Sequence, residues 1–310
     1  MKRCPITYED IDSGLYSKKG LNRLNPALNS LKLLPFTEQE LILESQERMS
    51  KMSIQGVQPK LSARLSVKNK CFTIVNKHGI FILKPNPTHF AQVPENEDVT
   101  MRMASAAGIE VPFHALIYNK EMKLVYVIRR FDRVGKSGKI HVEDFAQVAG
   151  KSRETKYKYS MEKVATLIED YCTFPVVEKL KLFRLTLFSY LIGNEDMHLK
   201  NFSLIHKENK IELSPAYDLL NSTIVLSNPQ EELALPLKGI KSNFTHKMFF
   251  DYYGKKRLGL NEKVVTKMAE EFESLHKAWF ELIEQSFLSS ELKERYVDVI
   301  NQRRKDMGWD

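Results

Sequence analysis

The feature that most constrains the fold is a change of hydrophobic period along the 310-residue chain. Residues 61–84 and 113–131 contain short runs rich in β-branched and aromatic residues, separated by turn residues, which is typical of strands. After about residue 140 the apolar residues recur three and four positions apart, which is typical of amphipathic helices. We therefore expect an α+β protein with two lobes, a strand-rich first lobe and a helical second lobe.

The same periods locate the individual elements. In the first lobe we expect helices at residues 38–52 and 94–108 and strands at residues 61–67, 71–75, 80–84, 113–119 and 123–131. In the second lobe we expect helices at residues 161–172, 176–192 and, as one long helix, 261–288, with a strand pair at residues 202–207 and 210–214. The expected domains are a leader at 1–37, the first lobe at 38–132 and the helical lobe at 133–310.

Composition limits the protein's surroundings. Apolar residues make up 43% of the chain and charged residues 28%, which is ordinary for a globular protein. No apolar run reaches membrane-spanning length and no secretory signal is visible, so we expect a cytoplasmic protein without a membrane partner. The three scattered cysteines, Cys4, Cys71 and Cys172, argue against a disulfide framework and suit a reducing compartment.

The net charge of +8 is spread along the chain. A solvated basic surface is the simplest interpretation, and a nucleic-acid or acidic-protein partner is the alternative. No zinc-finger spacing, helix-turn-helix pattern or single-stranded RNA signature indicates that the chain reads a nucleic-acid sequence itself. We therefore expect any contact with DNA to be indirect.

The polar stretch GNEDMHLKNF, at residues 193–202, follows the helix expected at 176–192. It carries Asp196 and Asn201, and Asp218 comes after the expected strand pair. Phosphoryl transfer uses one carboxylate to receive the acceptor proton, and an amide oxygen and a second carboxylate to hold Mg²⁺. The order acid, amide, acid therefore indicates such a site, although these residues are also common in turns. A zinc site at His198 is the weaker interpretation, because no paired His or Cys spacing accompanies it.

The first lobe offers the groups that this chemistry needs at the nucleotide. A polar loop joins a helix to a strand at residues 53–60, Lys84 ends a later strand, and Glu97 lies in the helix that follows. In kinases a flexible loop covers the phosphates, a strand lysine holds them and a helix acid orients the lysine. Alone, Lys84 is also typical of a surface lysine and Glu97 of charge compensation at a helix start. The order of all three favours a kinase.

Seven separated motifs between residues 52 and 220 resemble the HipA-type serine/threonine kinases of bacterial toxin–antitoxin systems. They are MSIQGVQPK, FILKP, ENE, RRFDR, EDFAQ, GNEDMHLKNFS and PAYDLL, in the family's order. The resemblance implies a two-lobed fold similar to that of eukaryotic protein kinases, but with divergent motifs, since neither H-R-D nor D-F-G occurs here. It also implies ATP and Mg²⁺ as cofactors.

The resemblance implies a role for each matching residue. Asp196 would be the catalytic base, and Asn201 and Asp218 would be the Mg²⁺ ligands. The implied nucleotide contacts are Lys84 at the phosphates with Glu97 as its partner, the backbone of Arg129, Arg130 and Phe131 at adenine, Asp132 at the ribose, His198 by the phosphates with Lys200 in the same loop, and Gln55, Gly56 and Val57 in the covering loop from Ser53 to Lys60.

The segment before the covering loop indicates a subtype. Only residues 1–51 precede the first motif, whereas full-length HipA-type toxins carry an extra N-terminal subdomain there. This is similar to the short toxin HipT of three-component HipBST systems, where a small separate antitoxin, HipS, replaces that subdomain and a helix-turn-helix protein, HipB, binds DNA. Ser53 corresponds to the family's regulatory serine, which can be autophosphorylated, and Gln55 stands where some relatives have a second serine.

Three functions are therefore open. The favoured one is a serine/threonine-protein kinase toxin that transfers the ATP γ-phosphate to a protein and inhibits translation and growth. Family substrates imply an aminoacyl-tRNA synthetase as the acceptor. The alternatives are a non-catalytic ATP-binding subunit of a repressor complex and a small-molecule kinase. The intact set of Lys84, Asp196, Asn201 and Asp218 favours the toxin, because a decayed kinase usually loses one of these groups.

Overall fold

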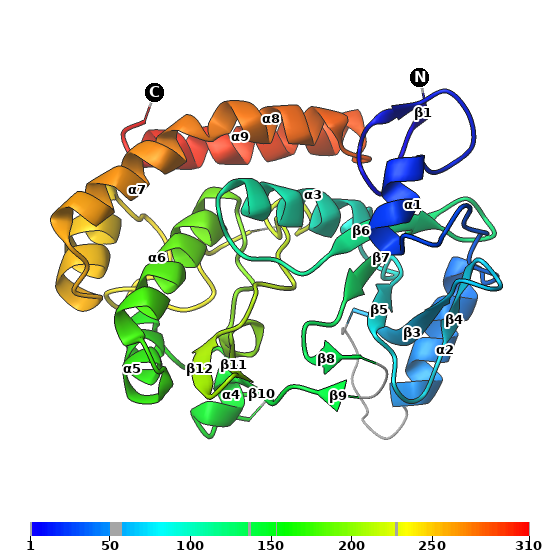
Figure 1. Cartoon of the computed structure of the whole chain (residues 1–310). Helices are drawn as coiled ribbons and strands as arrows, with labels where there is room; N and C mark the ends of the chain where they lie inside the picture. The colour runs from blue at the N-terminus through cyan, green and yellow to red at the C-terminus, as the bar shows by residue number, and fades with distance from the viewer. Residues whose placement is uncertain (1, 50–57, 136–137, 153, 227–228, 310) are drawn as a thin grey trace. The chain divides into compact units, whose positions relative to one another are not determined.

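A computed structural model describes residues 2–49, 58–135, 138–152, 154–226 and 229–309 (Figure 1). The chain divides into two compact units. Unit 1 comprises Met1–Asp98, Pro112–Gly138 and Gln285–Leu288, and unit 2 comprises Val99–Val111, Lys139–Glu284 and Ser289–Asp310. The domain boundaries expected from the sequence, after residues 37 and 132, stay predictions.

Unit 1 is built on a five-stranded antiparallel sheet with the strand order β4-β3-β5-β7-β6. The central strand, β5, places Lys84 opposite Tyr126 of β7. These strands confirm the ones predicted from β-branched and aromatic runs. Their bounds are β3 (Leu61–Ser66), β4 (Cys71–Ile74), β5 (Phe81–Lys84), β6 (His114–Tyr118) and β7 (Leu124–Arg129), and the short strands β8 (Arg133–Val134) and β9 (Gly138–Lys139) pair with each other.

The first 37 residues contribute to the core of unit 1. Leu21, Leu28 and Leu34 are buried with sheet residues such as Phe81, and Phe36 packs against the same core. Leu34 and Phe36 therefore pack on the chain's own sheet within unit 1. The elements of this region are β1 (Lys2–Arg3), β2 (Asp10–Ile11) and α1 (Lys18–Leu24). Helix α2 (Glu38–Met49) follows the region and lies near β3 (Figure 1).

Helix α3 (Val93–Ala106) begins in unit 1 and ends in unit 2. The side-chain oxygen of Asn86 accepts the N–H of Val93 at 3.0 Å, which satisfies one donor at the helix start. Gly108 follows the helix with a φ of +71°, the left-handed conformation that commonly ends helices. The helix predicted at residues 94–108 is confirmed, and its first turns carry Glu97.

Helix α6 (Pro175–Leu191) is the central helix of unit 2. Pro175 occupies its first turn, and most of its C-terminal half is buried. The ring of Phe188 packs edge-on against Trp279, with 5.6 Å between the ring centroids. Helix α5 (Met161–Tyr171) precedes it and is capped by Ser160, which accepts the N–H of Lys163. Both helices were predicted from their apolar spacing.

Unit 2 contains a three-stranded antiparallel sheet, formed by one strand that precedes α5 in the chain and two strands that follow α6. Its strands are β10 (Val142–Asp144), β11 (Ser203–Lys207) and β12 (Lys210–Leu213), with β11 in the middle. The pairing of β11 with β12 confirms the predicted strand pair. Strand β10 leads into the single-turn helix α4 (Phe145–Val148), and the 3-10 turn η1 (Leu199–Asn201) precedes β11.

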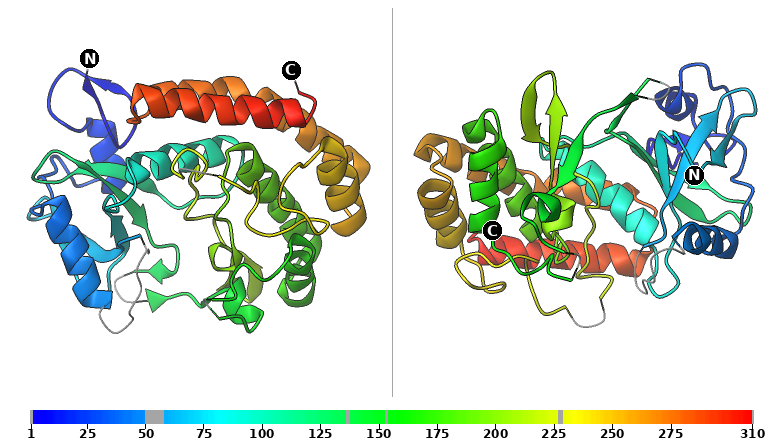
Figure 2. Two further views of the ribbon diagram at one scale, coloured as in Figure 1. Left: turned by 180° about the vertical axis from the view of Figure 1, so that it is seen from behind. Right: turned by 90° about the horizontal axis from the view of Figure 1, so that it is seen from below.

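The prediction of one long helix at residues 261–288 is wrong. Helices α7 (Glu262–Ser274) and α8 (His276–Gln285) are separated at Leu275. Arg304 of α9 (Ser290–Asp306) donates to the carbonyl of Glu273 at 2.7 Å, so a contact from a distant helix occupies a carbonyl where α7 ends. Helices α8 and α9 run side by side (Figures 1 and 2). A π-helical segment, η2 (Met248–Arg257), precedes α7 and was not predicted.

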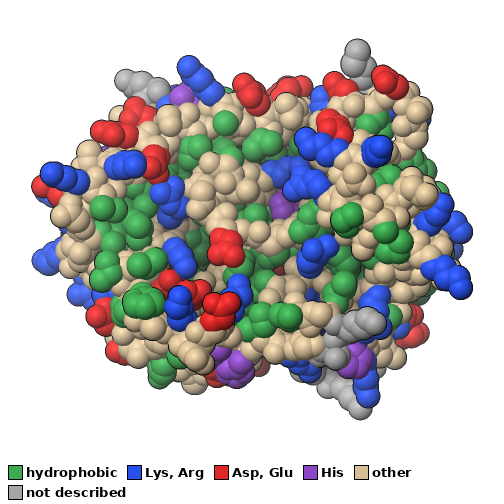
Figure 3. Space-filling model, viewed as in Figure 1, with side chains coloured by type: hydrophobic (Ala, Val, Ile, Leu, Met, Phe, Trp, Pro, Cys, Tyr) green, Lys and Arg blue, Asp and Glu red, His purple; other side chains and the backbone are tan. Residues whose placement is uncertain are grey.

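The structure bears on two expectations from composition, the absence of a membrane-spanning segment and the spread of charge. None of the helices in the described part of the chain is both long enough and apolar enough to cross a membrane. On the face drawn in Figure 3, basic side chains are interspersed with acidic ones. On that face the charged side chains therefore have the mixed distribution of a solvated surface.

Candidate active site

Lys84 and Glu97 form a buried ion pair in unit 1. Lys84 is the last residue of β5 and exposes 1% of its side chain, while Glu97, on α3, exposes none. The ammonium nitrogen of Lys84 also lies 5.3 Å from the centroid of the Tyr126 ring. Because two buried charges are costly unless they are paired, the side chains hold each other in place. The strand lysine and the helix acid, which the sequence pattern predicted to be partners, are therefore in direct contact.

The covering loop is described only at its end. Gln58 donates from Nε2 to the second carboxylate oxygen of Glu97 at 3.4 Å, so this end of the loop reaches the ion pair. Ser53, Gln55, Gly56 and Val57 lie outside the described residues. Their assignment to the phosphate-covering loop stays a prediction.

The segment expected to contact adenine follows β7. The backbone N–H groups of Arg129 and Arg130 donate to the carbonyls of Phe113 and Ile80, at 2.8 and 2.9 Å. These two N–H groups are therefore used within unit 1. An adenine contact from residues 129–131 needs another backbone group, which narrows the prediction made from the sequence.

Asp132, the expected ribose contact, is held by two arginines. It accepts hydrogen bonds from Arg130 Nε at 2.9 Å and Arg130 Nη2 at 2.7 Å, and a further one from Arg133. Burial disfavours the charge of Asp132, but the hydrogen bonds and charges of Arg130 and Arg133 outweigh it and keep the pKa of the carboxyl below its usual range. The carboxylate is thus ionised at neutral pH and can accept hydroxyl hydrogen bonds.

In unit 2, the polar loop (residues 193–202) begins at Gly193, two residues after the last residue of α6. Gly193 has a φ of +72°, a region that side chains rarely adopt. A Cβ there would come within 2.8 Å of Thr223 and Val299, so no room exists for one. The carbonyl of Gly193 accepts hydrogen bonds from the hydroxyls of Ser222 and Thr223, at 3.2 and 3.0 Å. The turn that starts the polar loop is therefore fixed by packing and hydrogen bonds.

The main chain of Asp196 organises the polar loop. Its carbonyl accepts the N–H of His198 at 2.8 Å and the side-chain Nδ2 of Asn201 at 3.2 Å. Its N–H donates to Oδ1 of the buried Asn194 at 3.1 Å. The side chain of Asp196 remains about half exposed, at 48%. The predicted base and a predicted metal ligand are therefore joined through one carbonyl group.

Two residues that the sequence analysis missed, Lys156 and Tyr157, contact the polar loop. Tyr157 donates its hydroxyl to Oδ1 of Asp196, and Lys156 Nζ lies 2.5 Å from Nε2 of His198. An ammonium group can only donate, so Nε2 accepts and the imidazole proton lies on Nδ1. Burial is the largest influence on the pKa of His198 and lowers it; Asp196 raises it, Lys156 lowers it, and the net shift is downward. His198 is therefore neutral at pH 7.

The hairpin of β11 and β12 returns the chain to the polar loop at Asp218. Tyr217, the residue before it, donates to the carbonyl of Lys200 at 2.9 Å. Asp218 has a φ of +55°, in the left-handed region that Asp adopts more readily than most residues with a side chain. Against the dominant effect of burial, the charge of Asp218 raises the pKa of His198, so the two groups are within electrostatic reach.

Lys200 points to the EDFAQ motif at residues 143–147. Its ammonium nitrogen lies 3.7 Å from the carboxylate of Asp144. Asp144 caps α4 by accepting the N–H of Gln147 and lies opposite Ser203 in the β10–β11 ladder. The motif is therefore a neighbour of the polar loop, and Lys200 has an acidic partner within unit 2.

The two predicted magnesium ligands of this unit, Asn201 and Asp218, offer oxygen atoms. The Nδ2 of Asn201 donates to the Asp196 carbonyl, so its Oδ1 is the amide atom left to bind a cation. Asp218 supplies a carboxylate from the adjoining turn. Mg²⁺ prefers hard oxygen ligands and is usually held by one or two protein carboxylates together with phosphate. Asn201 and Asp218 therefore form a suitable donor set.

The chain is similar in sequence to known proteins. The family model described as the HipA-like C-terminal domain matches residues 52–279. A Haemophilus influenzae protein with a provisional kinase name is 29% identical over 324 residues, covering 96% of this chain and 92% of that protein. The serine/threonine-protein kinase toxin HipA of Shewanella oneidensis is 28% identical over 207 residues, covering 60% of this chain and 47% of the toxin.

The fold has a counterpart among solved structures. The complex of HipA, HipB and operator DNA from Shewanella oneidensis contains a chain that matches with a TM-score of 0.70 and 22% identity, covering 91% of this chain and 74% of that chain. This likeness shows an α+β, protein-kinase-like fold, as the sequence predicted. Since the family model also spans most of the chain, the protein belongs to the family of HipA-like C-terminal domains.

Proposed function

We propose that the protein is an ATP-dependent serine/threonine-protein kinase. The observation that carries the proposal is the buried Lys84–Glu97 ion pair. A strand lysine paired with a helix glutamate is the arrangement with which kinases hold the ATP phosphates. The name of the HipA relative, a serine/threonine-protein kinase toxin, supports a protein as the acceptor.

In this proposal the residues of unit 2 have the remaining catalytic and binding roles. The half-exposed carboxylate of Asp196 receives the proton of the acceptor hydroxyl, which requires it to be ionised and accessible. Mg²⁺, when bound by Asn201 and Asp218, supplies positive charge that stabilises the transferring phosphoryl group. Neutral His198 lies 3.9 Å from the carboxylate of Asp196 and contacts the ammonium of Lys156, which can bind phosphate oxygens.

We propose further that this activity makes the protein a toxin of the short HipT type, whose acceptor is an aminoacyl-tRNA synthetase. Expression of the wild-type chain alone should arrest growth, because phosphorylation of a synthetase would deplete charged tRNA. The Asp196→Asn chain should allow growth, because it lacks the proposed base. Growth curves after induction, with protein levels matched by immunoblotting, measure both results.

Asp298→Asn is the control for this experiment. Asp298 is exposed on α9 and undergoes the same change of charge outside the polar loop. Its variant should arrest growth as the wild type does. Equal growth of the wild-type and Asp196→Asn strains, without any partner protein present, would contradict the toxin assignment while leaving the kinase assignment to be tested in vitro.

The partners of such a toxin are proposed on the same basis. The matching HipA chain was solved with HipB and operator DNA, which supports a helix-turn-helix protein as a partner and indirect contact with DNA. A small HipS-like antitoxin is the second proposed partner. Leu34 and Phe36 are engaged in the core of unit 1, so this antitoxin would have to bind through other residues.

Ser53 is the proposed site of self-regulation. After incubation with Mg²⁺ and ATP, intact-mass spectrometry should find one phosphate on the wild-type chain and none on Asp196→Asn or Ser53→Ala. A phosphate adds between about −1.5 and −2 charges close to those of ATP, so the Ser53→Asp mimic should lose toxicity. An unmodified Ser53 in an active enzyme would contradict this regulation.

A further inference from the structure

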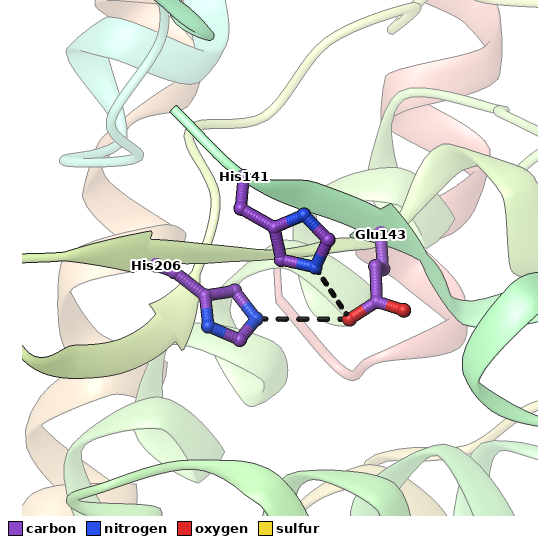
Figure 4. Close-up of side chains that lie close together, drawn as sticks. All are labelled: His141, Glu143 and His206. Carbon is purple, nitrogen blue, oxygen red and sulfur yellow. Dashed lines mark ion pairs between the residues drawn. The ribbon is translucent and has the colours of Figure 1, made fainter. Parts of the chain in front are cut away.

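A second cluster of ligating side chains lies on the three-stranded sheet of unit 2, outside the candidate active site. Glu143 belongs to β10, His141 immediately precedes that strand, and His206 belongs to β11 (Figure 4). His141 and Glu143 are two residues apart in an extended segment, so they lie on the same face of the sheet. The N–H of His206 donates to the carbonyl of His141 at 3.0 Å, which places the two histidines opposite each other.

The atoms of this cluster are spaced for a metal ion. One carboxylate oxygen of Glu143 lies 3.1 Å from Nε2 of His141 and 3.7 Å from Nε2 of His206, and suitable ligand atoms of all three residues lie within 4.8 Å of one another. Tetrahedral zinc with bonds of about 2.0–2.1 Å separates its ligands by about 3.3 Å. The cluster therefore needs only small side-chain rotations to surround an ion of this size.

The donor set selects the kind of ion. Imidazole nitrogen is a good ligand for zinc, copper, nickel and iron, whereas Mg²⁺ prefers oxygen. Two histidines and one glutamate form a known three-ligand set for zinc, which leaves a fourth position open. An ion pair with Glu143 would need one histidine only, yet both face the same oxygen, with 4.6 Å between their ring centroids.

We propose that His141, Glu143 and His206 bind one divalent transition-metal ion of the zinc class. The side chains are partly exposed, at 62%, 41% and 35%, so an ion can reach them from solvent. The bound ion cross-links β10 to β11. Three residues, or about 10 Å, from the histidines of the cluster along each strand lie Asp144 on β10 and Ser203 on β11, the residue that follows the polar loop. The cross-link therefore fixes a ladder that supports the candidate active site.

Direct binding to the purified full-length chain tests the site. The chain is first stripped with a chelator and then titrated with Zn²⁺ by calorimetry and with Co²⁺ by visible absorption, in excess Mg²⁺. One equivalent of each ion should bind, and Co²⁺ should give the intense bands of a four-coordinate nitrogen and oxygen site. His206→Ala and Glu143→Gln should each weaken binding by about 100-fold or more, since even a supporting group near a metal is worth 10- to 100-fold.

His89→Ala is the matched control, because His89 is an exposed histidine in unit 1 and lies outside the cluster. It should bind the ion as the wild type does. Circular dichroism checks that each variant is folded, and Glu143→Gln keeps the size of the side chain. Binding that is equal in the wild type and in the His206→Ala, Glu143→Gln double variant would overturn the proposal. So would cobalt bands of thiolate ligation, which would place the ion on a cysteine.

Discussion

Asp196→Asn and Asp218→Asn are each expected to lower the rate of phosphoryl transfer by about 10³-fold or more. The first change removes the proposed base, and the second removes a charged metal ligand. Loss of one such group typically costs two to four orders of magnitude. Transfer of radiolabel from γ-labelled ATP to the chain itself and to candidate acceptor proteins measures the effect.

Two further measurements make this result specific. Asp298→Asn should transfer phosphate at the wild-type rate, since its carboxylate is exposed on α9 and forms no hydrogen bond or ion pair with the described residues of the polar loop. Nucleotide binding by Asp196→Asn should persist, because its backbone contacts are unchanged. Full radiolabel transfer by both loop variants would remove the kinase assignment, and transfer only to small molecules would favour a small-molecule kinase. Binding without transfer by the wild type would favour a non-catalytic ATP-binding subunit.

The Lys84–Glu97 pair gives the largest expected effect on stability. Glu97→Gln should lower the free energy of unfolding by about 3 kcal/mol or more, because it leaves the buried ammonium of Lys84 without the carboxylate charge. The double variant Lys84→Met, Glu97→Leu should recover much of this loss, since apolar residues of similar volume tolerate burial. Urea denaturation of each variant measures the change.

Activity should not follow this recovery. Both variants should lose phosphoryl transfer. Glu97→Gln removes the carboxylate that holds Lys84 in place, and the double variant regains stability without any group that can hold the phosphates. Glu262→Gln is the control, because its carboxylate is 76% exposed in its pair with Lys255 and the change should have little effect on stability. A double variant that is stable and fully active would show that the pair serves the fold alone.

The fold could be predicted where local pattern decides it. The strands of unit 1 follow their β-branched and aromatic runs, and α5 and α6 follow their apolar spacing. The break between α7 and α8 could not be predicted, because no glycine or proline marks it. It coincides with contacts made by residues far away in sequence: Arg304 bonds the carbonyl of Glu273, and Trp279 donates from Nε1 to the carbonyl of Met103 at 3.1 Å.

Part of the candidate site could likewise be predicted from the sequence, and part could not. The order of Lys84, Glu97, Asp196, Asn201 and Asp218 is visible in the sequence because motif spacing records it. The contacts of Lys156 and Tyr157 are not visible, since their segment, KYKYS, has neither a helical nor a strand period. The use of the Arg129 and Arg130 N–H groups inside unit 1 also depends on pairings that only the folded chain specifies.

The shared carbonyl of Asp196 has a practical consequence for finding the acceptor. The hydrogen bonds from His198 and Asn201 end on the main chain of Asp196, so replacing its side chain by that of asparagine keeps them. The resulting protein should lack phosphoryl-transfer activity but keep the conformation of the polar loop. It could therefore be produced in living cells without harm and used as bait, with the bound acceptor held at the point where the wild-type enzyme would have modified and released it.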